Sequence, residues 1–340
     1  MEKTLEVKLA ALKKDPSSKV FILADAKDAD MAFGIASPGR TYDGRLRSLP
    51  EFREEMRQIV SQGLVDIMLM SASTSELLTI DERIFDNTTV TPAVRANDTT
   101  DIHIVRGSCY ASLASYPFSS PTIDHIQAGK SPCTDAERRL GANLGLYSVT
   151  FNNDLEADLK ALEAYKVFRL EAEAKHFDHF LEVFYPNAPA EFHGIPHEQI
   201  PFFLNDHVVR MLAGVPSASR PRFLKIPYGG PKAMEELCRY DPSLVVGVLG
   251  GSSGTTHDAF ALVYESKKYG ARVALFGRKI NAAENQLKFV EYMRMVADDQ
   301  ILPVEAVRAY HGELQKMGIP PHRSLEKDLE LTSTVMSYGG

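Results

Sequence analysis

A lysine lies at the end of a strongly apolar segment in the second half of the sequence. The segment reads Phe223-Leu224-Lys225-Ile226-Pro227 and has the length and composition of a buried β-strand. Burying a lysine favours the neutral, nucleophilic amine over the ammonium. A neutral amine can attack a carbonyl and lose water to give an iminium, which withdraws electrons from the neighbouring C–C bond. Lys225 is therefore a candidate Schiff-base residue; the alternative is a rim lysine paired with a carboxylate.

Two loops rich in small residues follow the next two candidate strands. The first spans residues 249–256 and reads LGGSSGTT, and the second spans residues 276–279 and reads FGRK. Such loops expose backbone N–H groups that can bind an anion, and an arginine can add a bidentate contact. In (β/α)8 enzymes the loops after the last two strands commonly hold phosphate. The expected anion site comprises Gly250, Gly251, Ser252, Gly277 and Arg278.

The segment from about residue 180 to about residue 295 resembles the class I aldolases of the deoxyribose-phosphate, tagatose-bisphosphate and archaeal-type fructose-bisphosphate aldolase superfamily. The likeness rests on FLKIPYGG at 223–230, GGS at 250–252 and GRKIN at 277–281. The first half of the chain resembles these enzymes only loosely. The resemblance implies that Lys225 forms the Schiff base and that Gly251, Ser252, Gly277 and Arg278 hold a phosphate or similar anion.

The resemblance also implies an aspartate after the first strand and a proton-transferring tyrosine or lysine on the fourth. Asp25 is our choice for the aspartate, with Asp28 as the alternative, because three acidic residues crowd this loop. Tyr147 would serve as general acid or base if it faced the barrel lumen. Alternation places Tyr147, Val149 and Phe151 on one face, which is more often a packed outer face.

Three further polar residues lie near the ends of apolar segments. Glu182 is flanked by apolar residues, and a buried carboxylate is costly unless it is paired. We expect Glu182 to meet Lys225 or another cation across the lumen, where it could orient the amine or act as a base. Arg95 and Asn97 project from the end of the third candidate strand and could recognise a second anion or sugar hydroxyls.

The histidines and cysteines give little support to a metal site. His193, His197 and His257 are interpreted as ordinary loop residues, and the three cysteines lie far apart without a CxxC pair. We therefore predict no metal, no bound cofactor and no disulfide framework.

Apolar segments of strand length alternate with helix-period segments through most of the chain. This order is typical of parallel βαβ units, and about eight of them predict a (β/α)8 TIM barrel of the α/β class. We expect the barrel to span residues 1–300, with an inserted loop after the third strand and a helical extension over residues 301–340 packed on the barrel. The predicted strands cover residues 20–24, 65–70, 91–96, 144–151, 180–185, 223–226, 244–249 and 273–276, and the clearest helices cover residues 49–62, 154–175 and 201–212.

The overall composition is that of a globular protein with a large core. Of 340 residues, 44% are hydrophobic and 24% are charged. The net charge of -7 gives no support to a nucleic-acid or anionic-membrane partner. No apolar run approaches the roughly 20 residues of a membrane-spanning helix, and the N-terminal segment lacks the apolar core of a secretory signal. We predict a cytoplasmic location, a small-molecule sugar or sugar-phosphate substrate and a homo-oligomer.

Three hypotheses about function follow. The leading one is a class I aldolase that cleaves or forms a C–C bond of a ketose, most simply a phosphorylated one, through a Schiff base on Lys225. In it Asp25, Glu182 and Tyr147 handle protons and hydroxyls. The alternatives are a sugar-phosphate isomerase, epimerase or acyl-transfer enzyme that forms no imine, and a non-catalytic sugar-phosphate-binding barrel. Phosphate, sulfonate and carboxylate groups all suit the expected anion site.

Overall fold

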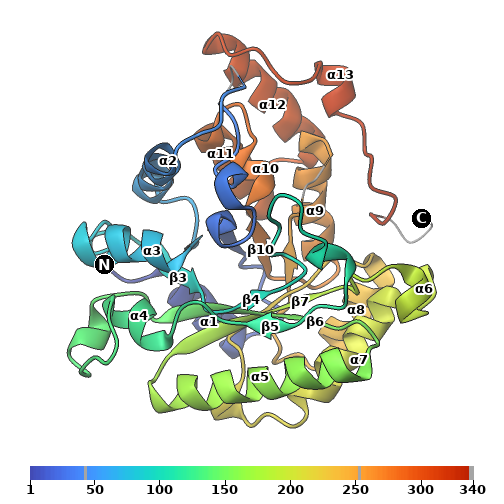
Figure 1. Cartoon of the computed structure of the whole chain (residues 1–340). Coiled ribbons are helices and arrows are strands. Elements are labelled where there is room, and N and C mark those ends of the chain that lie inside the picture. Colours follow the sequence, from blue (N-terminus) through green and yellow to red (C-terminus); the bar gives the residue numbers. More distant parts are fainter. Residues whose placement is uncertain (42–43, 252–253, 337–340) are drawn as a thin grey trace.

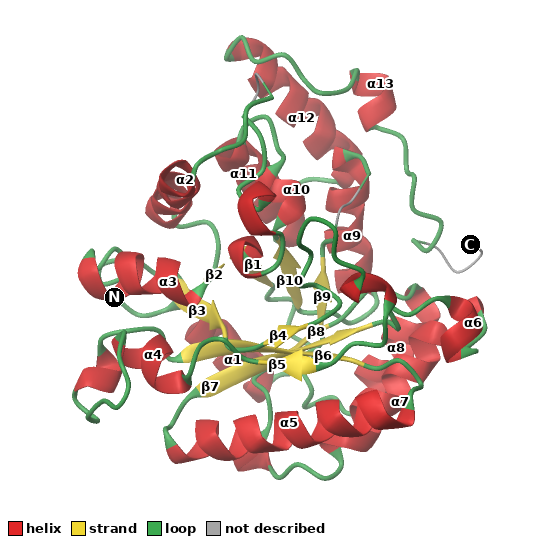
Figure 2. Cartoon of the chain, in the orientation of Figure 1, coloured by secondary structure: helices red, strands yellow, loops and turns green. Residues whose placement is uncertain are grey.

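The computed structural model describes residues 1–41, 44–251 and 254–336. Within these ranges, parallel strands form an eight-stranded sheet in the order β8-β7-β6-β3-β2-β1-β10-β9. The two ends of this order meet, because Ile226 pairs in parallel with Val248 and the amide of Leu224 donates to the carbonyl of Val245. Helices surround the strands (Figure 2). The predicted (β/α)8 barrel is confirmed.

Each predicted strand segment overlaps one strand of the barrel. The strands are β1 (Ile22–Lys27), β2 (Ile67–Met70), β3 (Thr91–Arg95), β6 (Leu144–Thr150), β7 (Asp178–Phe184), β8 (Leu224–Lys225), β9 (Gly247–Leu249) and β10 (Val273–Phe276). The largest difference is at β1, which was predicted over residues 20–24 and continues to Lys27. Asp25 therefore lies inside the strand, and Asp28 is the acid that follows its C-terminal end.

Side chains of the strands alternate between the lumen and the outer helical layer. The lower lumen is packed with aliphatic and aromatic residues, including Phe180 and Phe223, whose rings stack at 4.6 Å between centroids. Leu5, Leu9 and Leu12 of α1 (Thr4–Lys14) belong to the same cluster, so α1 closes the N-terminal end of the barrel. Polar groups of the lumen are thereby confined to its C-terminal end.

The outer layer consists of helices packed against the outward-facing strand residues. The three helices predicted most clearly correspond to α2 (Leu49–Gln62), α5 (Leu155–Ala174) and α7 (Ile200–Leu212). The other helices of this layer are α3 (Ala72–Ser75), α4 (Ile123–Ala128), α6 (Ala190–His193), α8 (Pro231–Tyr240), α9 (Thr256–Lys268), α10 (Arg278–Asn281) and α11 (Gln286–Ala297). None of the helices in the described ranges is both long and apolar enough to cross a membrane.

Two segments add to the minimal barrel. After β3, the strands β4 (Asp98–Thr99) and β5 (Pro117–Phe118) form an antiparallel pair before α4. At the C-terminal end, α12 (Pro303–Lys316) packs on α9 and α11 through a buried apolar face. The chain then forms α13 (Leu325–Asp328) and descends beside the barrel (Figure 1).

Candidate active site

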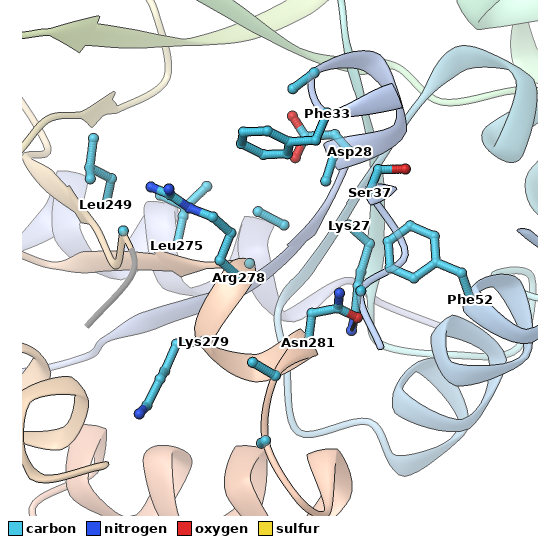
Figure 3. A pocket seen from close by; sticks show the side chains of 18 of the residues that line it. Lys27, Asp28, Phe33, Ser37, Phe52, Leu249, Leu275, Arg278, Lys279 and Asn281 are labelled. Atoms are coloured by element: carbon cyan, nitrogen blue, oxygen red, sulfur yellow. Dashed lines mark hydrogen bonds between the residues drawn. The ribbon is translucent and has the colours of Figure 1, made fainter. Parts of the chain in front are cut away.

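A cavity of about 880 Å³ opens at the C-terminal ends of the barrel strands. Side chains from β3, β7 and β8 reach it from the lumen, and the loops after β1, β9 and β10 form its walls. Figure 3 shows part of this wall, with Asp28 and Phe33 on the β1 side and Arg278 on the β10 side. In open and closed α/β folds alike, this end of the sheet is where loop variation builds ligand sites.

Lys225 and Glu182 form an ion pair between the neighbouring strands β8 and β7. The Nζ of Lys225 lies 2.6 Å from Oε1 of Glu182, and the two residues are in register in the sheet. The side chains are only 8% and 2% exposed. Because a buried charge is costly without a partner, each residue keeps the other in a defined position.

The second oxygen of Glu182 connects this pair to Arg95 and Asp28. Glu182 Oε2 accepts a hydrogen bond from Ser148 Oγ at 2.7 Å and lies 3.3 Å from Nη2 of Arg95. Arg95 also donates from Nε to Asp28 Oδ2 at 2.6 Å and from Nη1 to Ser148 Oγ at 2.9 Å. Burial disfavours the charge of Arg95, but Asp28 and Glu182 outweigh that effect and raise its pKa. The result is an alternating row of two cations and two carboxylates.

Asn97 supports this row from behind and does not face the cavity. Its side-chain amide donates to the carbonyl of Ser148 at 2.9 Å, and its Oδ1 accepts from the amide of Ser148 at 2.7 Å. The side chain is fully buried. Asn97 therefore fastens the end of β3 to β6 and positions Ser148, whereas the sequence predicted that it would bind substrate.

Asp25 points away from the lumen, contrary to its predicted catalytic role. Its strand neighbours Leu23 and Ala24 belong to the outer and lumen clusters respectively, which fixes the outward phase of Asp25. The closest cation is Lys27, whose Nζ lies 3.8 Å from Oδ2. Neither carboxyl oxygen accepts a hydrogen bond from the described residues. Burial raises the pKa of Asp25 to about 7, with Lys27 opposing the change. Asp28, the alternative named from the sequence, is the acid that lines the cavity.

Tyr147 also lies outside the group around Lys225. Its ring packs between β6 and α5, with centroids 4.5 Å from Phe168 and 5.1 Å from Tyr165. Burial raises the pKa of Tyr147. Because side chains alternate along β6, the lumen position next to Tyr147 is Ser148. The predicted role of Tyr147 in proton transfer therefore has no geometric support.

Two of the loop glycines are required by packing. A Cβ on Gly250 would lie 2.1 Å from the ring of Phe276, and a Cβ on Gly277 would lie 2.3 Å from the carbonyl oxygen of Ala26. Such distances are far below van der Waals contact, so any side chain there would displace its neighbours. Gly250 and Gly277 bring β9 and β10 close to adjacent strands. Packing alone therefore explains why glycine occupies these two positions, and no bound ligand is needed to account for it.

Gly251 and Arg278 are the loop residues that face the cavity. Gly251 has a φ of 53°, in the left-handed region that glycine adopts readily, and a Cβ there would lie 3.9 Å from Nη2 of Arg278. Arg278 is exposed to the cavity, and its guanidinium lies 5.8 Å from the centroid of Phe33. Among the described residues, no carboxylate forms an ion pair with Arg278. Ser252, also predicted to bind the anion, lies outside the described residues.

A second buried lysine lines the same cavity and was missed from the sequence. Lys27 Nζ donates to Gln286 Oε1 at 2.5 Å and lies 3.3 Å from Oδ1 of Asn281, beside Phe52 (Figure 3). Burial lowers its pKa, although Asp25 raises it in part. The signal was the same as for Lys225, a lysine at the end of an apolar strand, but the strand was predicted too short to include it.

No cluster of metal-ligating residues appears among the parts of the chain that are described. Groups of three or more His, Cys, Asp or Glu side chains arranged around one point are absent there.

Comparison with known proteins identifies relatives in structure only. No family model matches the chain, and no curated protein matches it. A fructose-bisphosphate aldolase from Slackia heliotrinireducens superposes with a TM-score of 0.63 at 14% identity, covering 91% of each chain. An archaeal fructose-1,6-bisphosphate aldolase, with its catalytic lysine covalently bound to a carbinolamine intermediate, gives 0.59 at 14% identity and covers 85% of this chain and 99% of its own. The chain has the fold of the Schiff-base aldolases.

A protein of Corynebacterium glutamicum is also similar in structure to this chain. That protein superposes with a TM-score of 0.58 at 16% identity, covering 87% of this chain and 94% of its own. At such low sequence identities the likeness establishes the fold, and the chemistry must be inferred from the residues of the site. Within the aldolase fold, this chain places a buried lysine, a carboxylate 2.6 Å from it and an arginine-lined loop in one cavity.

Proposed function

We propose that the protein is a class I aldolase that cleaves or forms a C–C bond of a ketose through a Schiff base on Lys225. The observation that carries the proposal is the buried pair of Lys225 and Glu182 at the end of the barrel strands. A carboxylate 2.6 Å from the amine is within reach for proton transfer. The cavity beside the pair is also lined by Arg278 and Gly251, which suit an anionic group on the substrate.

The first step is formation of the imine. Glu182 accepts a proton from the ammonium of Lys225, and the neutral amine attacks the carbonyl carbon of the ketose. Glu182 returns the proton to the carbinolamine hydroxyl, which leaves as water. The iminium that remains is positively charged and lies beside the Glu182 carboxylate, which stabilises it.

The second step is cleavage of the C–C bond. The substrate hydroxyl two carbons from the iminium carbon loses its proton to Glu182, and the electrons of the breaking bond move to the iminium nitrogen. An aldehyde leaves, and an enamine stays on Lys225. Protonation of the enamine by Glu182 and attack of water on the new iminium release the second product and restore the ammonium. Asp28 lines the cavity and can accept a hydrogen bond from a substrate hydroxyl.

Borohydride trapping tests this proposal directly. The protein is incubated with a panel of ketoses and ketose phosphates, reduced, and mapped by peptide mass spectrometry. The expected result is one adduct per chain on Lys225, absent from Lys225→Arg, with Lys27 unmodified in the same digest. No adduct with any member of a broad panel, or an adduct on Lys27 alone, would overturn the assignment of Lys225.

One observation also favours an enzyme of the same barrel that forms no imine. The ion pair with Glu182 fixes the position of Lys225, which could serve as a fixed cation in an isomerase, epimerase or acyl-transfer enzyme. Arginine keeps the positive charge but cannot form an imine. Turnover retained by Lys225→Arg would therefore support this second function, and turnover abolished by it supports the aldolase.

A further inference from the structure

The end of the chain is fastened across the start of helix α9. Residues 320–336, here termed the C-terminal strap, place Asp328 so that its Oδ1 accepts from the amide of Thr256 at 2.8 Å. The other oxygen of Asp328 lies 2.9 Å from Nε2 of His311 on α12. Further along, the amide of Thr332 donates to Oδ1 of Asp258 at 2.8 Å. These contacts hold the strap against α9 and α12.

The strap limits which groups of the protein can bind an anion at the N-terminal end of α9. The N-terminal end of a helix after a glycine-rich loop is normally open to a phosphate. In α9 this position is occupied by carboxylates of the protein itself, Asp328 on Thr256 and Asp258 on the amide of Thr255. An anionic group in the cavity must therefore be bound mainly by side-chain cations.

Besides the cations near Lys225, three cations from two other segments of the chain line the cavity. Arg278 and Lys279 come from the start of α10, and Arg323 comes from the strap. Arg278 and Lys279 project in different directions, with Arg278 towards Leu249 and Lys279 away from it (Figure 3). Lys279 Nζ lies 3.5 Å from the carbonyl oxygen of Gly254. The charged ends of Lys279 and Arg278 therefore lie in different parts of the cavity.

These cations have no direct neutralising partner within the described parts of the chain. No described carboxylate lies within ion-pair distance of any of the three, and Glu284, an acid that also lines the cavity, accepts hydrogen bonds from Tyr310 and from the amide of His322. Burial lowers the pKa of Lys279 and Arg323 adds to the effect, whereas the more distant carboxylates of Asp328, Glu284 and Asp258 oppose it. A bound anion could pair directly with Lys279 and Arg323, which none of these carboxylates does.

Arg323 also lies where two cavities join. A smaller cavity of about 500 Å³ shares Gly254, His322 and Arg323 with the main one, and Lys327 of the strap also lines it. The region around Arg323 therefore has room for a group of its own, beyond the space near Lys225.

We propose that Lys279 and Arg323 form a second oxyanion subsite, distinct from the one at Arg278 and Gly251 and completed by the C-terminal strap. The ligand is a phosphate, sulfonate or carboxylate group, carried either by the substrate or by a separate small anion. The proposal rests on the proposed function only in taking this cavity to be the substrate site. It assigns a binding role to a segment that lies outside the barrel itself.

Titration with inorganic phosphate tests the subsite without turnover. Isothermal calorimetry on the full chain is expected to show two phosphates per chain, and Arg323→Ala is expected to weaken one of them by about 10- to 100-fold, as for loss of a charge-assisted hydrogen bond. Arg278→Ala should weaken the other. Arg308→Ala is the matched control, because Arg308 lies on the neighbouring helix α12 and lines neither cavity. Unchanged phosphate binding in Arg323→Ala would overturn the proposal.

A linear alkane bisphosphate, compared with the corresponding monophosphate, distinguishes the source of the anion. If one substrate carries both groups, the bisphosphate binds wild type more tightly and loses that advantage in Arg323→Ala. If the second anion is separate, the bisphosphate gains nothing, while two inorganic phosphates still bind. Borohydride trapping on Lys225 is measured in parallel, so that loss of the aldolase proposal and loss of the subsite give different results.

Discussion

The substitution Asp25→Asn separates a structural role of this carboxylate from the catalytic role that the sequence predicted. Asp25 is fully buried, faces the outer layer and accepts no hydrogen bond from the described residues. Asparagine has nearly the same shape but remains neutral at every pH. The substitution should therefore leave imine formation intact and change how stability depends on pH.

The direction and size of the change follow from the pKa of Asp25, which burial raises from 3.8 to about 7. The folded state binds this proton more tightly than the unfolded state. Its stabilising contribution is complete below pH 3.8 and is lost as the pH rises through 7. The interval between the two pKa values corresponds to roughly 4 kcal/mol. The free energy of unfolding of Asp25→Asn should match wild type near pH 4 and exceed it by about that amount at pH 8.

Urea denaturation at several pH values, followed by circular dichroism, measures this difference. Asp28→Asn is the matched comparison, because Asp28 lies three residues further along, in the cavity, and accepts from Arg95. It should reduce borohydride trapping without the rise in relative stability at high pH. An offset between Asp25→Asn and wild type that is the same at pH 4 and pH 8 would refute the reasoning. Loss of trapping in Asp25→Asn at unchanged stability would return Asp25 to the catalytic set.

Three further predictions concern residues around the site. Tyr147→Phe should leave borohydride trapping unchanged, because the ring lies in the outer layer; a loss of trapping at unchanged stability would contradict this position. Asn97→Ala removes both hydrogen bonds to the backbone of Ser148 and should lower the free energy of unfolding in urea by about 3 kcal/mol, against which an unchanged value would argue. Gly250→Ala should destabilise by about 1–3 kcal/mol in the same assay, since its methyl group would overlap the ring of Phe276; wild-type stability would show that the loop can move away.

The barrel could be predicted because its strands are buried on both faces. Such strands appear in the sequence as nearly continuous apolar runs, and eight of them at helix-length intervals leave few alternatives. The ends of strands were harder to place. In β1 the residues Asp25 and Lys27 interrupt the apolar run, so the strand was ended too early, although both are buried inside it.

The composition of the site depends on the phase of each strand, which a one-residue error reverses. On β6 this separates Tyr147, which packs on α5, from Ser148, which contacts Glu182. Contacts between distant segments are even harder to predict from the sequence than the phase of a strand. Asp328 meets Thr256 across 72 positions, and no local pattern marks either residue as the partner of the other.

Two buried lysines line one cavity, and their surroundings decide between them as nucleophiles. Lys27 is fully buried on the outer side of β1, and its Nζ donates to the amide oxygens of Gln286 and Asn281. The carboxylates of Asp25 and Glu55 lie 3.8 and 4.0 Å from this Nζ, beyond hydrogen-bond distance, and the outward phase keeps Lys27 from the lumen. Lys225 keeps some exposure to the cavity and has the carboxylate of Glu182 at 2.6 Å, a group that can take a proton and return it. Burial alone would favour Lys27, but an imine requires access and a proton acceptor within hydrogen-bond distance, and of these two lysines only Lys225 has both.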